Sequence, residues 1–103
     1  MPPGYNGKIA HIDLTNASIS IEQPPEQFYR HYWGGQGFVA YYLLKETTAN
    51  TDPLDPENRL IFANGVMSGA PAGGFGRHSV GARSPLTGGI GESEAGGFWG
   101  AEL

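Results

Sequence analysis

The segment from residue 71 to residue 89, PAGGFGRHSVGARSPLTGG, constrains the fold more than any other part of this chain. It holds six glycines, two prolines and two arginines, with few large side chains that a core could bury. Glycine loses more conformational entropy on folding than any other residue, so it is favoured where the backbone takes a positive φ or lies close against another group. The segment therefore predicts backbone that packs against a ligand or a protein partner.

The overall composition excludes several classes of protein. A chain of 103 residues forms one domain or part of one. Its formal net charge of -4 offers no basic surface to a nucleic acid. The absence of cysteine excludes disulfides, thiolate zinc sites and iron–sulfur ligation within these residues. No apolar run approaches the ~20 residues of a membrane span, so we expect a cytoplasmic protein that binds neither membrane nor nucleic acid.

The first half of the sequence predicts a hairpin followed by two helices. Residues 8–14 and 18–22 alternate apolar and polar side chains on either side of a TNAS turn, which indicates two paired strands. Two prolines open a helix over residues 24–33, and the glycines at 34 and 35 end it. A second helix is expected over residues 36–46. Its predicted apolar stripe consists of Phe38, Tyr41, Tyr42 and Leu44.

The second half of the sequence predicts three more strands. Two Asp-Pro pairs mark a turn, and residues 59–64 form the clearest strand after it. Shorter strands are expected over residues 79–83 and 89–94, and the first turn of a helix begins near Phe98. We therefore predict an α+β fold, a single domain over residues 1–103 with a largely antiparallel sheet and two short helices.

Two glycine motifs resemble nucleotide-binding sequences, and both have a better explanation. Residues 35–40, GQGFVA, match the relaxed dinucleotide pattern, but a predicted helix precedes them where that pattern requires a strand. Helix termination and close packing account for them. Residues 74–79, GFGRHS, lack the Lys-Ser or Lys-Thr end of a phosphate loop. Neither motif predicts a nucleotide site.

Arg77 is the first candidate for a binding residue. A guanidinium presents a planar fork of donors that matches a phosphate, and glycine-lined backbone lets neighbouring N–H groups approach the same anion. Two interpretations remain open from the residues alone, an anion site and a surface arginine in a loop. Arg83 is a weaker candidate, because an arginine at the end of a strand often pairs with a carboxylate.

Two glutamates form the second candidate. Glu92 and Glu94 are two residues apart, so a strand places them on one face. Such a pair could hold a cation or serve acid–base chemistry. Two glutamates on a solvated strand are the more common case. His11 and His31 are expected to be structural, and no His/Asp/Glu spacing predicts a metal site.

Four stretches, taken together, closely resemble the N-terminal segment of the aldehyde ferredoxin oxidoreductase family of tungsten enzymes. The resemblance runs in order over residues 7–103, and it covers only the front part of a family whose members are several times longer. The stretches are GGQGFVAYYLLKE, DPLDPENRLIFANGVMSG, GGFGRHSVGARSPLTGGI and AGGFWGAEL. The resemblance implies that this chain is one half of a two-repeat N-terminal domain whose halves exchange strands.

The resemblance also implies a cofactor. In the family this domain forms a base beneath a tungsten atom held by two pterins, whose phosphates are bridged by magnesium. Arg77 matches the family arginine beside the pterin phosphate. Glu94 stands where the family has an asparagine whose backbone carbonyl helps to bind the magnesium, so a carbonyl ligand is implied at Glu94. The remaining implied cofactor-binding residues are Gly74, Gly76, Ala95, Gly96 and Gly97.

The implied function is that of a larger enzyme. The family converts an aldehyde and water to a carboxylic acid and passes electrons to ferredoxin or a similar carrier. Its 4Fe-4S cluster and proton-transfer residues lie in later domains, so we expect the isolated chain to be inactive and to carry no cofactor. Expected partners are the remainder of the enzyme or a second copy in a homodimer. A standalone anion- or pterin-binding module and an assembly domain remain alternative interpretations.

Overall fold

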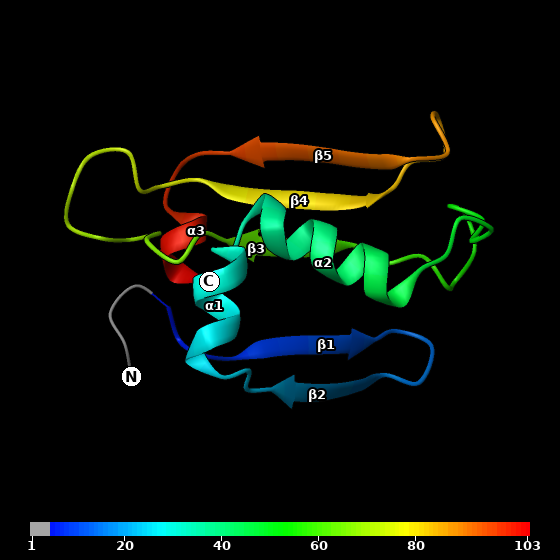
Figure 1. The fold of residues 1–103 in the computed structure, drawn as a ribbon, viewed down its shortest axis with the longest axis horizontal. Coiled ribbons are helices and arrows are strands. Elements are labelled where there is room, and N and C mark those ends of the chain that lie inside the picture. The colour runs from blue at the N-terminus through cyan, green and yellow to red at the C-terminus, as the bar shows by residue number, and fades with distance from the viewer. Residues whose placement is uncertain (1–4) are drawn as a thin grey trace.

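The structure is a computed structural model that describes residues 5–103. The predicted domain starts at residue 1, and residues 1–4 lie outside the described part. Eight elements follow one another along the chain (Figure 1). They are β1 (Ile9–Asp13), β2 (Ser18–Glu22), α1 (Glu26–Tyr32), α2 (Gln36–Glu46), β3 (Ile61–Asn64), β4 (His78–Arg83), β5 (Ile90–Ala95) and α3 (Trp99–Glu102). The predicted α+β class and element order are confirmed.

The strands form two separate antiparallel sheets. One is the β1–β2 hairpin, and the other has the order β3-β4-β5. Helix α2 lies across one face of the three-stranded sheet, while the hairpin lies on the other side of α2 from β5 (Figure 1). The predicted strand ends differ from the observed ones by one or two residues, because hydrogen bonding across the ladder decides where a strand begins and periodicity does not.

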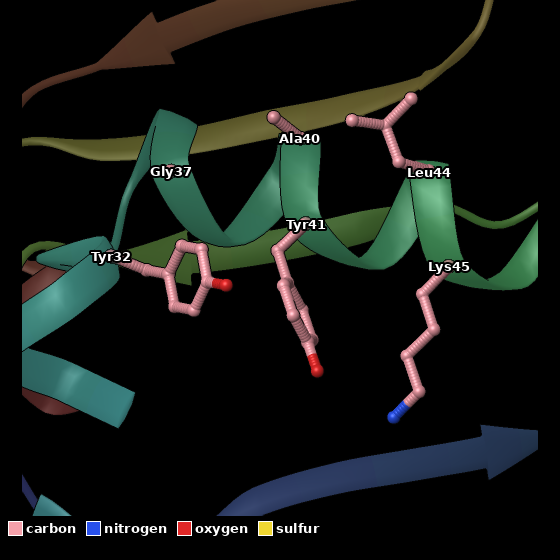
Figure 2. Close-up of a pocket in the computed structure, with 6 residues that line it drawn as sticks. All are labelled: Tyr32, Gly37, Ala40, Tyr41, Leu44 and Lys45. Atoms are coloured by element: carbon pink, nitrogen blue, oxygen red, sulfur yellow. The ribbon is translucent and has the colours of Figure 1, made fainter. Parts of the chain in front are cut away.

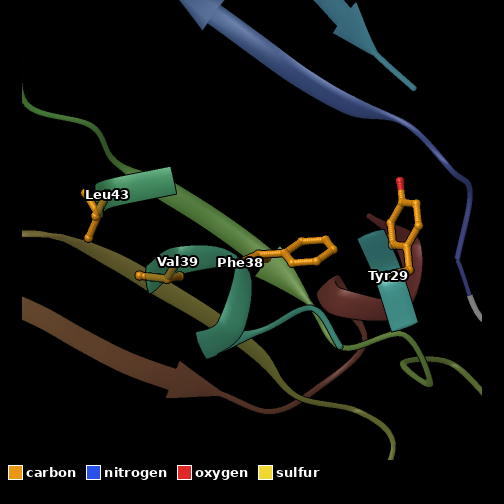
Figure 3. Close-up of a cluster of buried hydrophobic side chains, with 5 residues drawn as sticks. Tyr29, Phe38, Val39 and Leu43 are labelled. Atoms are coloured by element: carbon orange, nitrogen blue, oxygen red, sulfur yellow. The ribbon is translucent and has the colours of Figure 1, made fainter. Parts of the chain in front are cut away.

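The hydrophobic core lies between α2 and the three-stranded sheet, and it extends to α1 (Figure 3). Val39 and Leu43 are each 1% exposed. The other members of the buried cluster are Tyr29, Phe38 and Ala63. The predicted stripe was wrong at Leu44, which is 75% exposed. The sheet contacts the side of α2 that carries Val39 and Leu43, so the helix is rotated from the predicted orientation.

A glycine in β4 brings the helix close to the sheet. An ideal Cβ on Gly81 would overlap the Val39 side chain and would also lie 3.2 Å from the Gly91 carbonyl oxygen. Because adjacent strand residues point to opposite faces, Gly81 and Ser79 face α2, and His78 and Val80 face away from it. Phe62, the cross-strand neighbour of Val80, is 50% exposed on that opposite face.

Helix α1 ends one residue earlier than its glycines predict. Trp33 itself takes the left-handed conformation with φ 58°, and its backbone N–H donates to the Tyr29 carbonyl. The indole Nε1–H donates to the Arg30 carbonyl at 2.6 Å, which stabilises this conformation. Gly34 then forms a bridge with Gly65, and no Cβ would fit at Gly34 beside the Asn64 carbonyl. This contact links the helices to the end of β3.

Candidate functional site

The glycine-rich segments meet at one end of the three-stranded sheet. The register pairs Asn64 with His78 and His78 with Ala95, so β3 ends, β4 begins and β5 ends at the same edge. The loop that joins β3 to β4 leaves from this edge, and so does the short link from β5 to α3 (Figure 1). We call this region, residues 65–77 and 96–98 with α3, the glycine end.

The loops of the glycine end touch one another. An ideal Cβ on Gly76 would lie 3.4 Å from the Gly97 carbonyl oxygen. An ideal Cβ on Gly96 would lie 4.0 Å from Arg77 Cγ, so the arginine side chain runs beside Gly96. Gly74, with φ 88°, and Gly97, with φ 113°, have no atom within 4 Å of such a Cβ. The predicted glycines therefore lie together, and two of them border open space.

Arg77 lies between these loops with its side chain exposed. Its backbone carbonyl accepts a hydrogen bond from Ser68 Oγ at 3.2 Å. Within residues 5–103 its guanidinium makes no hydrogen bond or ion pair, whereas the guanidinium groups of Arg30 and Arg59 each pair with a glutamate. An unpaired guanidinium beside open, glycine-lined backbone fits an anion such as a phosphate.

The two predicted glutamates share a face of β5 but differ in surroundings. Glu92 lies opposite Gly81 and Glu94 lies opposite Ser79, so both are on the face that α2 covers. Gln36 Nε2–H donates to Glu92 Oε2 at 2.8 Å, and Glu92 is only half-buried. Glu94 is exposed, as is Ala95, which follows it at the glycine end. Glu92 is thereby committed to α2, and Glu94 borders the candidate site.

Arg83 lies at the opposite end of the sheet and does not contribute to the glycine end. Its NH2 group donates to the Gly88 carbonyl at 3.1 Å and to the Ala49 carbonyl at 3.4 Å. The expected carboxylate partner was wrong, because neighbouring turns present carbonyl oxygens to this side chain. His11 contacts the Glu22 carboxylate at 2.7 Å, and His31 is exposed beside Tyr32.

Sequence reasoning missed Asn64 and His78, which border the glycine end and contact α3. Asn64 Nδ2–H donates to the Gly100 carbonyl at 2.6 Å, across 36 positions of the chain. The His78 ring packs on Trp99 in a tilted arrangement with a centroid distance of 4.5 Å, and His78 is 9% exposed. No local pattern in the sequence predicts a contact between residues so far apart in the chain. The only signal was that His78 directly follows Arg77 in the glycine-rich segment.

A second surface feature is an open groove on the outer side of α2 (Figure 2). It is lined by Tyr32, Gly37, Ala40, Tyr41, Leu44 and Lys45. The Lys45 ammonium lies 5.6 Å from the centre of the Tyr41 ring. The groove contains none of the predicted site residues.

The described residues contain neither a membrane-spanning helix nor a side-chain cluster for a metal ion. Across residues 5–103, no helix has the length and apolar character needed to cross a membrane. In that same range, no three His, Asp or Glu side chains gather in a way that could hold a metal ion.

The arrangement is an α+β unit with Arg77 and several glycines at one end of its sheet, and comparison identifies its family. Residues 9–103 match the family model described as "Aldehyde ferredoxin oxidoreductase, N-terminal domain". The chain belongs to the aldehyde ferredoxin oxidoreductase family, and the resemblance read from its motifs is confirmed.

Relatives in two organisms carry the same unit. The chain is 46% identical over 100 residues to a tungsten-containing aldehyde ferredoxin oxidoreductase of Pyrococcus abyssi, a match that covers 97% of this chain and 16% of the relative. It is 45% identical over 100 residues to the corresponding enzyme of Pyrococcus horikoshii, with the same two coverages. The chain thus spans about a sixth of the length of these relatives.

A solved structure is similar to this chain in both sequence and fold. It is the active site complex BamBC of benzoyl coenzyme A reductase in complex with 1,5-dienoyl-CoA. The match has a TM-score of 0.88 and 38% sequence identity, and it covers 93% of this chain and 15% of that one. The same unit therefore occurs in proteins whose names describe different reactions.

Proposed function

We propose that this unit is the N-terminal part of a tungsten–bispterin oxidoreductase and that its glycine end binds the phosphate of the pterin cofactor. The observation that carries the proposal is the Arg77 side chain, whose Cγ lies 4.0 Å from an ideal Cβ on Gly96 and whose guanidinium has no partner within residues 5–103. Membership of a family whose relatives are named as tungsten-containing supports the choice of cofactor. Tungsten held by pterin dithiolenes would supply two-electron redox chemistry.

Each residue of the proposed site has a defined task. Arg77 would bind a phosphate through charge-assisted hydrogen bonds. The glycines would let the backbone approach the flat pterin, because no Cβ stands between. The Glu94 carbonyl would be a magnesium ligand, and its carboxylate would face the cation. The glycines of this site are Gly74, Gly76, Gly96 and Gly97, and Ala95 completes the link between Glu94 and Gly96.

The reaction that we propose belongs to the whole enzyme. It oxidises an aldehyde to a carboxylic acid with water as the oxygen source, and electrons pass to a ferredoxin-like carrier through a 4Fe-4S cluster in the later domains. We place this enzyme in the cytoplasm. The 103-residue chain alone would have no activity, because it supplies only the phosphate-binding base of the site.

The direct test uses pyrophosphate as a probe for the phosphate site. Arg77→Ala should weaken pyrophosphate binding by about tenfold or more, because a charge-assisted hydrogen bond is worth ~1.5–3 kcal/mol. Isothermal titration calorimetry with pyrophosphate would measure the affinity. Arg30→Ala is the matched control, since Arg30 is also exposed and its guanidinium pairs with Glu26 instead. Equal affinities in the wild type and the Arg77 variant would overturn the assignment.

A second candidate function is that of an assembly domain without cofactor, which pairs with a second copy of itself. The observation that favours it is the exposed apolar face of the hairpin, where Ile12, Ile19 and Ile21 are 63%, 68% and 55% exposed. Exposed apolar patches of this kind mark interaction sites. Light scattering at micromolar concentration decides between a dimer, which this function requires, and a monomer of 11.0 kDa, which excludes it.

A further inference from the structure

We propose that Asn64 and His78 are positioning residues, which hold α3 against the sheet and so fix the spacing of the two loops beside Arg77. The inference rests on the proposed function, because the spacing matters for the phosphate site described above. Neither residue is a ligand in this proposal. Both act through α3, which contacts each loop of the glycine end.

The first contact in this arrangement joins β3 to α3. Asn64 Nδ2–H donates to the Gly100 carbonyl at 2.6 Å. An ideal Cβ on Gly100 would lie 3.1 Å from Asn64 Oδ1 and 3.5 Å from His78 Cβ. The helix therefore lies so close to the end of the sheet that a Cβ at this position would require Asn64 or α3 to shift by a few tenths of an ångström.

The second contact joins β4 to α3. The His78 ring packs on the Trp99 indole with a centroid distance of 4.5 Å and an interplanar angle of 56°. Phe62 of β3 packs on the same indole, edge to face, at 5.6 Å. Two neighbouring strands thus contact one helical residue, which fixes both the distance and the rotation of α3.

The position of α3 sets the position of both loops. The link of Gly96 and Gly97 leads directly into the helix, and the Gly97 carbonyl oxygen lies 3.4 Å from an ideal Cβ on Gly76. At the other end of the first loop, an ideal Cβ on Gly69 would lie 3.4 Å from Ala101 Cβ. The sheet, α3 and the two loops therefore form a closed chain of contacts around Arg77.

Asn64 and His78 each bury a polar atom without a partner at this contact, as Tyr29 Oη, Arg83 Nε and Glu92 Oε1 do elsewhere in the described residues. Asn64 Oδ1 and His78 Nδ1 are both buried, and neither has a hydrogen-bond partner within residues 5–103. Burying a polar atom without a partner is destabilising, and an apolar side chain of similar shape would avoid that penalty. The contacts of Asn64 and His78 with α3 therefore carry the proposal, and the unpaired atoms do not.

The chain provides a matched control at the opposite end of the same strands. Asn58 Nδ2–H donates to the Pro53 carbonyl at 2.8 Å and to the Arg83 carbonyl at 3.1 Å. Asn58 Oδ1 accepts from the Arg83 backbone N–H at 3.1 Å. Asn58 and Asn64 therefore tie β3 and its neighbours by the same chemistry, but only Asn64 lies at the glycine end.

The test compares Asn64→Ala with Asn58→Ala in the full 103-residue chain. Amide hydrogen exchange is measured at Leu103, whose N–H donates to the Trp99 carbonyl, and at Gly69, whose N–H donates to the Phe75 carbonyl. Asn64→Ala should speed exchange at both amides by about tenfold and weaken pyrophosphate binding severalfold. In Asn58→Ala both readouts should stay within about twofold of their wild-type values. This should hold even if the variant loses as much thermal stability as Asn64→Ala. Equal effects of the two variants would overturn the proposal.

Two further variants keep the test decisive. Gly100→Ala, which retains both side chains but places a Cβ 3.1 Å from Asn64 Oδ1, should reproduce the Asn64→Ala pattern because it disturbs the same contact between Asn64 and α3. His78→Phe retains an aromatic ring on Trp99 and should preserve slow exchange at Leu103. Fast exchange in His78→Phe, or slow exchange in Gly100→Ala, contradicts the proposed role.

The exchange readout separates this inference from the phosphate assignment. If the wild-type chain does not bind pyrophosphate, the proposed phosphate site is wrong, and exchange at Leu103 and Gly69 still decides whether Asn64 fixes the loops. If pyrophosphate binds and responds to Arg77→Ala but not to Asn64→Ala, the phosphate site stands and the positioning role is overturned.

Discussion

The three-stranded sheet and the β1–β2 hairpin contact the same helix, α2, in opposite ways. The sheet presents small and apolar residues to α2, with Gly81 against Val39 and Ala63 in the buried cluster. The hairpin presents a mostly polar face. It holds Ile9, which packs against the buried cluster, and Glu22, whose carboxylate accepts hydrogen bonds from His11 at 2.7 Å and from Tyr42 at 2.9 Å.

The other face of the hairpin carries Ile12, Ile19 and Ile21. The register pairs Ile12 with Ile19 and Ala10 with Ile21, so these side chains share one face, and all four are exposed. An apolar–polar alternation predicts a strand whichever face turns inward. The difference between the two regions shows that this chain is assembled on both sides of α2, by burial on one side and by directed hydrogen bonds on the other.

The largest difference is expected for truncations of apolar side chains in the two regions. Leu43→Ala should lower the free energy of unfolding by ~2–5 kcal/mol, because it leaves a cavity between α2 and the sheet. Ile19→Ala, on the exposed face of the hairpin, should change it by less than ~0.5 kcal/mol. Denaturant unfolding followed by circular dichroism measures both. Comparable losses would show that the hairpin face is buried in solution.

A smaller effect is expected from adding one methyl group at the helix–sheet contact. Gly81→Ala should destabilise the chain by ~1–3 kcal/mol, because the new Cβ overlaps the stiff, buried Val39 side chain. The double variant Gly81→Ala with Val39→Ala should lose less than the two single variants together. Strict additivity in this double-mutant cycle would mean that the two residues are not in contact.

Removing one hydrogen bond of the hairpin contact should cost less again. Tyr42→Phe deletes the hydroxyl that donates to Glu22, and we expect a loss of ~1–2 kcal/mol because the acceptor is charged. The aromatic ring remains, so the packing of Phe28 and Tyr41 on it should be unchanged. Thermal unfolding at pH 7 measures the loss. An unchanged midpoint would show that the hydroxyl is solvated in the native state.

The hairpin contact should also depend on pH. Burial acts to raise the pKa of Glu22, but the hydrogen bonds from His11 and Tyr42 outweigh it, and the pKa lies below its usual value of 4.5. The carboxylate therefore stabilises the fold above that value, and this contribution is lost as the pH falls through the lowered pKa. Glu22→Gln should flatten the stability profile below pH ~5. Identical profiles for variant and wild type would contradict the shift.

The smallest effect is expected from a charge on the outer face of the hairpin. Ile19→Lys should change the stability of an isolated monomer by less than ~0.5 kcal/mol, because the side chain is 68% exposed. If the chain pairs with a second copy through this face, the same variant should shift the population to monomer. Sedimentation of wild type and variant at one concentration tests this. If the variant forms as much dimer as the wild type, the dimer must form through a different surface.

The sequence alone determined the elements and their order, because the signals that mark them are local. Alternation over a few residues predicted the hairpin, and helical spacing with flanking glycines predicted residues 36–46, which match α2. The glycine-rich segment with Arg77 was also recognisable, since its motifs are contiguous, and they were sufficient to indicate the family.

The packing of those elements came from contacts between residues far apart in the chain. Leu44 and Leu43 are adjacent leucines, and only the position of the sheet exposes the first and buries the second. Alternation in the hairpin does not say which face turns inward, and in the structure the face of Ile9 and Glu22 lies toward the core and α2. Asn64 reaches Gly100 across 36 positions, a contact set by strand register and helix docking. Such choices depend on the summed free energy of the whole fold, which no local pattern of residues encodes.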